Sequence, residues 1–302
     1  MNCVETAGLS IRYPDVTALE DLDLSIPAEM LYGIIGPDGA GKTSLLRAIC
    51  TLLPSSGGRI SVMGMDVRKG QKRLRALIGY MPQRFSLYQD LSVEQNILFF
   101  GRLFGVPKDK LRQRMEKLYK FSRLKPFANR LAGHLSGGMK QKLALSCALI
   151  HTPSLIVLDE PTFGVDPVSR LEFWQMLHEL KAEGISIVVS TPYMDEAQQC
   201  DRVSLLHRGR IMTEGPPDEI LARHPLRLYS LHGSHLQDVM RFMKALPGID
   251  GLQMFGNEIH LSSKIPLDAR MFELWRASCP HLRSMKEIRP GMEDVFLTMM
   301  GS

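Results

Sequence analysis

The chain has 302 residues and a mass of 34.0 kDa, with 44% hydrophobic and 23% charged residues and a net charge of +5. This composition is typical of a folded protein and excludes a disordered chain, a collagen-like chain and a small disulfide-bonded scaffold. The charge is too small and too evenly distributed to indicate nucleic-acid binding by itself, so no nucleic-acid partner is expected. Neither a run of about 18 apolar residues nor a signal peptide is visible, so we expect a cytoplasmic chain.

The five cysteines lie far apart without a CxxC pair, which favours reduced, buried thiols in a reducing compartment. The nine histidines form no HxxxH pattern, so no transition-metal site is expected.

Hydrophobic periodicity predicts an alternation of strands and helices with a helical insertion. The elements predicted for the first part of the chain are, in order, a half-buried strand at 22–26, a strand at 31–35, a helix from 44 to 53, helices at 93–103 and 110–124, and alternating strands and helices from 155 to 221. This order favours α/β architecture with a parallel sheet, interrupted by helices at about 85–150.

The character of the sequence changes after His224-Pro225. The elements predicted there are a strand at 226–231, a helix at 236–246, strands at 252–255 and 258–261, a helix at 269–278 and a final strand and helix. We therefore predict two domains, 1–224 and 225–302, the second a small α+β domain.

Residues 36–43 match the pattern GxxxxGK[ST] at every fixed position, between a predicted strand and a predicted helix. Glycines allow backbone N–H groups to turn toward a polyphosphate, and the helix N-terminus also favours an anion. Lys42 would place its ammonium beside the β and γ phosphates, and Thr43 would offer its hydroxyl to Mg²⁺. The predicted phosphate-binding loop consists of Gly36, Pro37, Asp38, Gly39, Ala40, Gly41, Lys42 and Thr43.

A second motif supplies carboxylates. The apolar run 155–158 is followed directly by Asp159 and Glu160. At the end of a buried strand, Asp159 would hold Mg²⁺, and Glu160 would act as general base toward the attacking water. Together the two motifs predict a nucleoside triphosphatase.

Residues 135–141, Leu-Ser-Gly-Gly-Met-Lys-Gln, lie between these motifs and resemble the signature motif of the ATP-binding cassette (ABC) ATPases. The resemblance covers residues 1 to about 222. It implies a P-loop NTPase cassette with a RecA-like parallel core, an antiparallel β subdomain and a helical subdomain, using ATP and Mg²⁺. It also implies that Ser136, Gly137 and Gly138 bind the γ-phosphate held by a second cassette, in a homodimer or heterodimer.

The same resemblance assigns further site residues. Tyr13 occupies the place of an aromatic that stacks on adenine, and Ser44 belongs to the nucleotide-binding set. Gln83 is similar to the glutamine that contacts Mg²⁺ and the attacking water. Asp166, in Gly164-Val165-Asp166, corresponds to a loop that reaches the partner cassette.

Two positions depart from the family pattern. Asp38 stands where most cassettes carry asparagine. Pro192 stands where the family has a switch histidine that bonds the γ-phosphate, and proline offers no donor at all. His207 lies one strand later and cannot replace it by sequence. The site could therefore be degenerate, with slow hydrolysis or a mainly structural role.

The stretch 91–96 and the C-terminal run 289–297 resemble the ABC-2-type exporter branch, and the motif combination is similar to the first cassette of multidrug exporters with two cassettes in one chain. The resemblance implies an ABC-2-type membrane permease as a separate partner and a peripheral location at the inner face of the cell membrane. Residues 85–102, rich in aromatic side chains, would dock on that permease or pack the helical subdomain.

Two other classes of function compete with an exporter ATPase. One is a soluble ABC ATPase that acts on ribosomes or DNA, although no second cassette with a charged linker and no long coiled-coil insertion is present in these residues. The other is a P-loop kinase or GTPase, which the signature motif disfavours.

Overall fold

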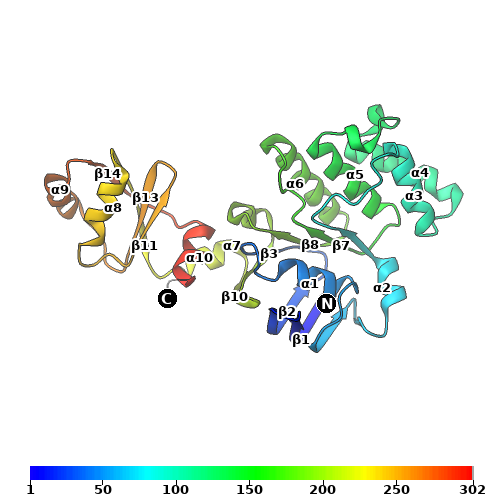
Figure 1. The fold of residues 1–302 in the computed structure, drawn as a ribbon, viewed down its shortest axis with the longest axis horizontal. Helices are drawn as coiled ribbons and strands as arrows, with labels where there is room; N and C mark the ends of the chain where they lie inside the picture. Colours follow the sequence, from blue (N-terminus) through cyan, green and yellow to red (C-terminus); the bar gives the residue numbers. More distant parts are fainter. Residues whose placement is uncertain (301–302) are drawn as a thin grey trace. The chain divides into compact units, whose positions relative to one another are not determined.

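The computed structural model describes residues 1–300, which form two compact units, Met1–Pro217 and the part that begins at Asp218 (Figure 1). Gly301 and Ser302, the last two positions of the predicted C-terminal domain, lie outside the described residues. The domain boundary proposed between residues 224 and 225 lies shortly after the division between the units.

A six-stranded sheet forms the centre of the first unit. Its strands are β3 (Leu31–Ile35), β6 (Ile78–Met81), β7 (Leu155–Asp159), β8 (Ser186–Thr191), β9 (Arg202–His207) and β10 (Arg210–Gly215), in the order β10-β9-β3-β8-β7-β6. Neighbouring strands are parallel except β10, which is antiparallel to β9. Every residue of β3, β7 and β8 is buried, because both faces of a parallel sheet are covered, and this explains their apolar sequences.

An antiparallel sheet packs against this centre. Its strands are β1 (Asn2–Arg12), β2 (Thr17–Pro27), β4 (Gly57–Val62) and β5 (Met65–Asp66), in the order β2-β1-β4-β5. Side chains of this sheet, of α1 (Lys42–Ile49) and of the parallel strands share one hydrophobic core. The helix predicted for 44–53 begins two residues earlier and ends at Ile49, since Thr51 adopts a left-handed backbone with φ +60°. The helix α2 (Gln71–Leu77) leads into β6.

The segment predicted as helical contains α3 (Val93–Leu103), α4 (Lys108–Ser122) and α5 (Gly137–Leu149), which lie together in Figure 1. Two 3₁₀ turns, η1 (Lys125–Phe127) and η2 (Ala132–His134), connect α4 to α5. Ser92 and Gln95 form a capping box that starts α3. The remaining elements are α6 (Pro167–Ala182) and the 3₁₀ turn η3 (Met194–Gln199).

The second unit contains an antiparallel sheet in the order β12-β13-β11-β14. Its elements are β11 (Arg227–Gly233), α8 (Leu236–Lys244), β12 (Gly251–Phe255), β13 (Glu258–Ser263), α9 (Ala269–Ser278), β14 (Leu282–Ile288) and α10 (Met292–Met300), preceded by α7 (Pro217–Ala222), which begins at the last residue of the first unit. Tyr229, Leu231, Ile259 and Trp275 belong to a separate hydrophobic core. The order of strands and helices predicted for this part agrees with the structure.

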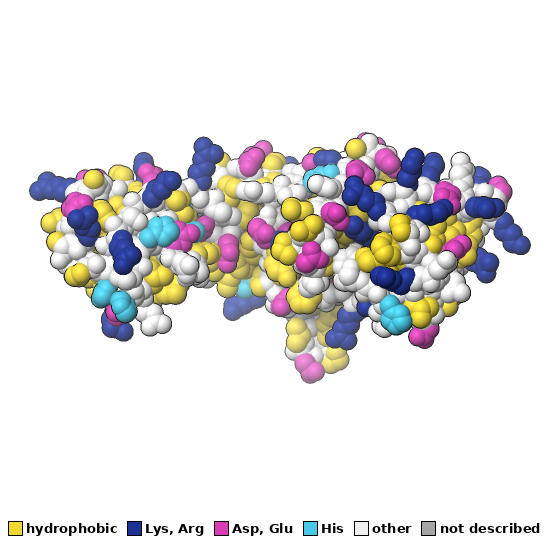
Figure 2. All heavy atoms as spheres, turned by 90° about the horizontal axis from the view of Figure 1, so that it is seen from above, with side chains coloured by type: hydrophobic (Ala, Val, Ile, Leu, Met, Phe, Trp, Pro, Cys, Tyr) yellow, Lys and Arg dark blue, Asp and Glu magenta, His cyan; other side chains and the backbone are white. Residues whose placement is uncertain are grey.

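Two surface properties follow. Among residues 1–300, no helix has both the length and the apolar character that crossing a membrane requires. Acidic and basic side chains both occur across the face shown in Figure 2, as the mixed charge composition predicts.

Candidate nucleotide site

Four neighbouring parallel strands end at one edge of the central sheet, and the predicted motifs follow these ends. Ile35 pairs with Thr191, Asp159 pairs with Ser190, and β6 runs parallel beside β7. In open α/β sheets this edge, at the carboxyl ends of the strands, is where ligands bind. The fold therefore brings the loops after β3, β6, β7 and β8 to one place.

The loop after β3 approaches neighbouring backbone so closely that only glycine fits at two positions. A Cβ on Gly36 would lie 2.1 Å from the carbonyl oxygen of Leu206. A Cβ on Gly41 would lie 2.4 Å from the carbonyl oxygen of Ala18, and the φ of Gly41 is +107°. These glycines allow the loop to fold tightly and to start α1 at Lys42, with the positive end of the helix dipole toward the loop.

Lys42 and Glu160 form a buried ion pair in this loop. Lys42 Nζ lies 3.0 Å from Glu160 Oε1, and each side chain is only 4% exposed. The same ammonium donates to the carbonyl oxygens of Gly36 at 2.8 Å and Pro37 at 3.1 Å. Gln83 Nε2 donates to the other oxygen of Glu160 at 2.7 Å. Because a buried charge is costly without partners, this set of contacts keeps both charged groups at the site.

Asp159 provides one oxygen that suits a cation. Its Oδ1 accepts hydrogen bonds from Thr43 Oγ1 at 3.1 Å and from Ser190 Oγ at 2.8 Å. Its Oδ2 is buried and has no hydrogen-bond partner, although buried carboxylate oxygens are normally paired. Carboxylate and hydroxyl oxygens are the ligands that Mg²⁺ prefers. Asp159 and Thr43 therefore fit Mg²⁺ and would hold it, whereas the predicted ligand Gln83 contacts Glu160 in this structure.

The outer part of the phosphate loop is more open. Asp38 and Gly39 are exposed, whereas Ala40 is buried. Ser44 lies in the first turn of α1. Its hydroxyl forms a hydrogen bond of 3.2 Å with the hydroxyl of the exposed Tyr13. Tyr13 is thus held beside the loop, which supports its proposed role as the platform for adenine.

The predicted signature residues lie elsewhere in the unit. Ser136 Oγ accepts from the N–H of Met139 at 3.3 Å and caps α5. A Cβ on Gly138 would lie 2.4 Å from Ser169 Oγ, so the glycine permits close packing of α5 on α6. Asp166 Oδ1 accepts from the N–H of Ser169 at 2.9 Å, and this hydrogen bond lowers the pKa of Asp166.

Within residues 1–300, no hydrogen bond or ion pair joins the signature residues to the phosphate loop. The structure thus brings together the loop residues with Gln83, Asp159 and Glu160, and it keeps Ser136, Gly137, Gly138 and Asp166 as a separate group.

Sequence reasoning missed Ser190. Its hydroxyl donates to Asp159 and accepts from the backbone N–H of Glu160 at 3.1 Å, so it orients both predicted acids. The available signal was a pair of polar residues, Ser190 and Thr191, directly after the apolar run 187–189. Pro192 follows that strand directly.

We predict that Lys42→Ala weakens ATP binding. It removes the side-chain cation placed in the loop, a charge-assisted contact of about 1.5–3 kcal/mol, which corresponds to roughly ten- to a hundredfold in Kd. Calorimetry with Mg·ATP measures this effect, and Lys72→Ala, on the exposed part of α2, is the charge-matched control. Because Lys42→Ala also leaves Glu160 without its cation, the same change in a Glu160→Gln background isolates the phosphate contact. An unchanged Kd in both backgrounds would refute the loop assignment.

Comparison with known proteins places these observations in one family. The model of the family described as "ABC transporter" matches residues 19–163. The chain is 40% identical to the probable multidrug ABC transporter ATP-binding protein YbhF of Escherichia coli, over 97% of this chain and 51% of that protein, so it spans about half the length of this relative. It is 33% identical to the Nod factor export ATP-binding protein I of Rhizobium sp., over 99% of this chain and 97% of that protein.

A solved structure gives the same result for the fold. The dimeric post-hydrolysis state of the ATP-binding cassette MJ0796, bound to ADP and Pi, matches with a TM-score of 0.64 and 26% identity, over 70% of this chain and 98% of that one. The predicted fold class, an α/β P-loop cassette, is confirmed. With its phosphate loop and acid pair at one sheet edge and relatives of this kind along its length, the chain belongs to the ATP-binding proteins of ABC transporters and carries the ATPase cassette of that family.

Proposed function

We propose that this chain binds and hydrolyses Mg·ATP to drive an ABC-2-type exporter, through a separate membrane permease and together with a second cassette. The observation that carries the proposal is the convergence of Lys42, Glu160 and Gln83, beside Asp159 with its unpartnered oxygen. The names of the relatives, which refer to multidrug transport and Nod factor export, support the direction of transport. On this proposal the chain works at the cytoplasmic face of the membrane.

On this proposal, the residues at this sheet edge have different roles in hydrolysis. Lys42 binds the β and γ phosphates. These phosphates compete with the carboxylate of Glu160 for the ammonium group of Lys42. When Lys42 turns to the phosphates, Glu160 Oε1 loses its cation and becomes free to accept a proton from the attacking water. Gln83 holds Oε2 and orients the carboxylate. Bound Mg²⁺ supplies neutralisation of the charge that develops on the phosphate oxygens.

The separate group of signature residues supports pairing with a second cassette. Ser136 ends the loop before α5, where helix N–H groups and glycines can bind an anion without a lysine. No described contact directs it to the phosphate loop of its own chain. A phosphate group held by another cassette is therefore its proposed ligand, and the dimer of the MJ0796 cassette is a precedent for such pairing.

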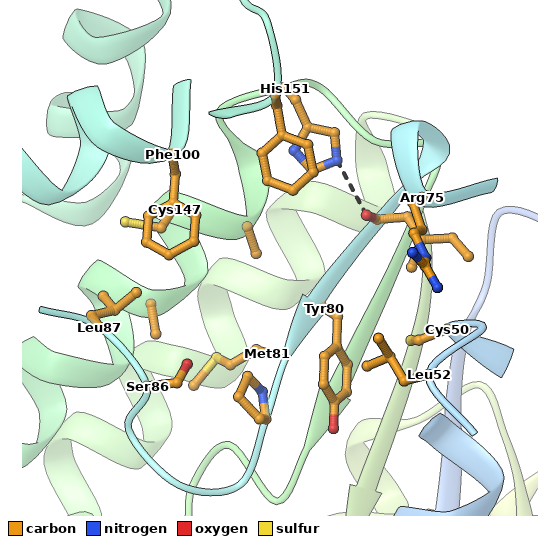
Figure 3. Close-up of a pocket in the computed structure, with 15 residues that line it drawn as sticks. Cys50, Leu52, Arg75, Tyr80, Met81, Ser86, Leu87, Phe100, Cys147 and His151 are labelled. Carbon is orange, nitrogen blue, oxygen red and sulfur yellow. Dashed lines mark hydrogen bonds between the residues drawn. The ribbon is translucent and has the colours of Figure 1, made fainter. Parts of the chain in front are cut away.

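A groove between the sheet and the helical segment is the proposed site for the permease. Its volume is about 240 Å³, and its lining joins strand β6 and the following loop to α3 and α5. Figure 3 shows Phe100, Leu87 and Cys147 on one side and Leu52 and Arg75 opposite. An amphipathic helix of the permease, with apolar side chains toward the groove and an acidic one toward Arg75, would fit this lining.

Exposed aromatic side chains continue from the groove. Tyr88 and Phe99 are 50% and 37% exposed, and their rings pack edge to face with centroids 4.8 Å apart. Leu87, in contrast, is buried. Phe104 stacks on His151 at 4.0 Å beside the groove, and burial lowers the pKa of His151, which favours its neutral form. Apolar surface of this kind supports a protein partner over free solvent.

Purification of the full chain from its own cells, under mild detergent, tests the exporter proposal. A co-purifying multi-span permease supports it. Ribosomes in place of a permease would support the competing class, a soluble ABC ATPase acting on translation.

We predict that cysteines at positions 86 and 89 crosslink efficiently to the permease. Ser86 lines the groove and Gln89 is exposed beside it, so both lie on the proposed docking face. The control is a cysteine at Lys72, which does not line the groove. Crosslinks that form only from the opposite face of the cassette would contradict the groove assignment.

The two sites of a mixed cassette pair should respond differently to substitution. If the partner has a switch histidine, its own phosphate loop forms the faster site and uses Ser136 of this chain. We therefore predict that Ser136→Arg abolishes ATPase activity of the complex, whereas Glu160→Gln lowers it less than the equivalent change in the partner. Steady-state hydrolysis by the reconstituted complex measures both. Equal losses from the two glutamine variants would contradict the asymmetry.

We predict that Pro192→His accelerates ATP hydrolysis. One preorganised donor at a developing charge is worth roughly 10²–10³ in rate, so even an imperfectly placed histidine should give about a tenfold gain. Pro192→Ala is the matched control, because it removes the ring without adding a side-chain donor. A gain with alanine equal to that with histidine would point to backbone geometry, and no gain with histidine would refute the donor argument. Robust, cooperative turnover by the unmodified chain alone would refute it as well.

A further inference from the structure

Glu196 is a buried carboxylate that joins three segments around the site. Its side chain is only 2% exposed. Its Oε1 accepts from Thr162 Oγ1 at 2.7 Å and Trp174 Nε1 at 3.1 Å and lies 2.6 Å from Arg170 Nε. Its Oε2 accepts from Thr191 Oγ1. Thr162 follows β7, Arg170 and Trp174 belong to α6, and Thr191 ends β8.

This degree of pairing has a physical consequence. A carboxylate removed from water is costly unless its charge is paired and its lone pairs are filled, and here both oxygens have partners. Moving any one of the three segments would break a buried hydrogen bond. Glu196 therefore holds the loop after β7 at a defined position relative to β8 and α6.

The backbone that this loop must hold is strained. Glu160 has a φ of +49°, in the left-handed region that a residue with a Cβ rarely adopts. Such a conformation persists only where the surrounding structure enforces it. On one side, the N–H of Glu160 donates to the carbonyl oxygen of Ser190 at 3.1 Å. On the other side, Thr162, which lies two residues after Glu160, donates its hydroxyl hydrogen to Glu196.

We propose that Glu196 is a positioning residue for ATP hydrolysis, which holds the strained turn 160–162 so that the Glu160 carboxylate faces Gln83 and the phosphate loop. The inference rests on the proposed role of Glu160 as general base. Among the described residues, no hydrogen bond or ion pair joins Glu196 to Lys42 or Asp159, so we infer that it acts through the backbone and not on the nucleotide.

Arg170 extends the same network to the loop that carries Pro192. Its guanidinium pairs with Asp195 at 2.7 Å and lies 4.7 Å from the ring centre of Tyr193. The N–H of Tyr193 donates to Thr191 Oγ1 at 3.0 Å. The segment after Pro192 is thus held by contacts within the cassette.

The test compares Glu196→Gln with Asp195→Asn in the full chain. Both substitutions remove one negative charge beside Arg170, but Asp195 is 74% exposed and has no contact with Thr162. Single-turnover hydrolysis with protein in excess over ATP reports the chemical step, and calorimetry with Mg·ATP reports binding. We expect Glu196→Gln to lower the single-turnover rate by about tenfold to a hundredfold, since a misplacement of about 1 Å can cost that much. The Kd for Mg·ATP should change by less than about twofold, because the phosphate loop is unaltered, and Asp195→Asn should change neither quantity.

A second variant keeps the proposal testable if Glu196→Gln does not fold. Thr162→Val deletes the hydroxyl that ties the strained turn to Glu196 and should lower the rate in the same direction. In the double variant the two losses should not multiply, because residues that act through one contact are non-additive. Multiplying losses, or a rate within about twofold of the unmodified chain for both single variants, would overturn the positioning role.

Glu160→Gln separates this inference from the function on which it rests. If Glu160→Gln retains the full rate, the proposed general base is wrong and the positioning role falls with it. If Glu160→Gln abolishes hydrolysis while Glu196→Gln and Thr162→Val do not affect it, the general base stands and only the role of Glu196 is refuted.

Discussion

The buried ion pair between Lys42 and Glu160 is the interaction on which the candidate site depends. Each charge would be costly at this depth without the other, so the phosphate loop and the end of β7 must meet with matching geometry. That meeting requires β3 and β7 to end at the same edge of the sheet, with β8 between them. Three features of the fold bring Lys42 and Glu160 together. They are the apolar strands, the close backbone approach at Gly36 and Gly41, and the strained turn at Glu160.

The pairing also explains why several neighbouring residues are polar. Gln83 donates to Glu160 and Ser190 donates to one oxygen of Asp159, whereas the other oxygen of Asp159 stays without a partner. A site that leaves a buried carboxylate oxygen unsatisfied, on a side chain that also contacts the hydroxyl of Thr43, is suited to a small hard cation. Burial of this unpaired oxygen costs free energy in the protein without nucleotide. On this proposal, Mg·ATP binding removes that cost, because the cation becomes the partner of the oxygen.

One short segment relates the chemistry to the proposed permease groove. Gln83 contacts Glu160, and Pro82 and Ser86, on either side of it in the sequence, line the groove. The two proposed sites therefore share the loop after β6, and a displacement of that loop would affect both, as coupling between two sites requires. The loop after β6 is the shortest covalent path between the two sites in this structure.

The sequence by itself determined the local chemistry of this protein. The phosphate loop, the acid pair after an apolar strand and the signature motif are contiguous runs, and their meaning depends on residue types at fixed spacing. The helical segment and the order of elements after His224 were also predictable, because hydrophobic periodicity is a local property. The helix after the phosphate loop was predicted too long, since apolar residues continue to Leu53 although Thr51 turns the backbone.

Only the tertiary structure decided how separate runs meet. The ion pair of Lys42 joins residues 118 positions apart by their numbers, and no local pattern encodes that distance. For the same reason, the polar end of the strand that carries Ser190 was only a weak signal and Glu196 showed none, because their partners lie on other segments of the chain. The close packing of α5 on α6, the two helices that Ser136 and Asp166 cap, likewise could not be predicted from either motif alone. Spacing within a motif specifies chemistry, whereas burial and strand order decide which motifs share a site.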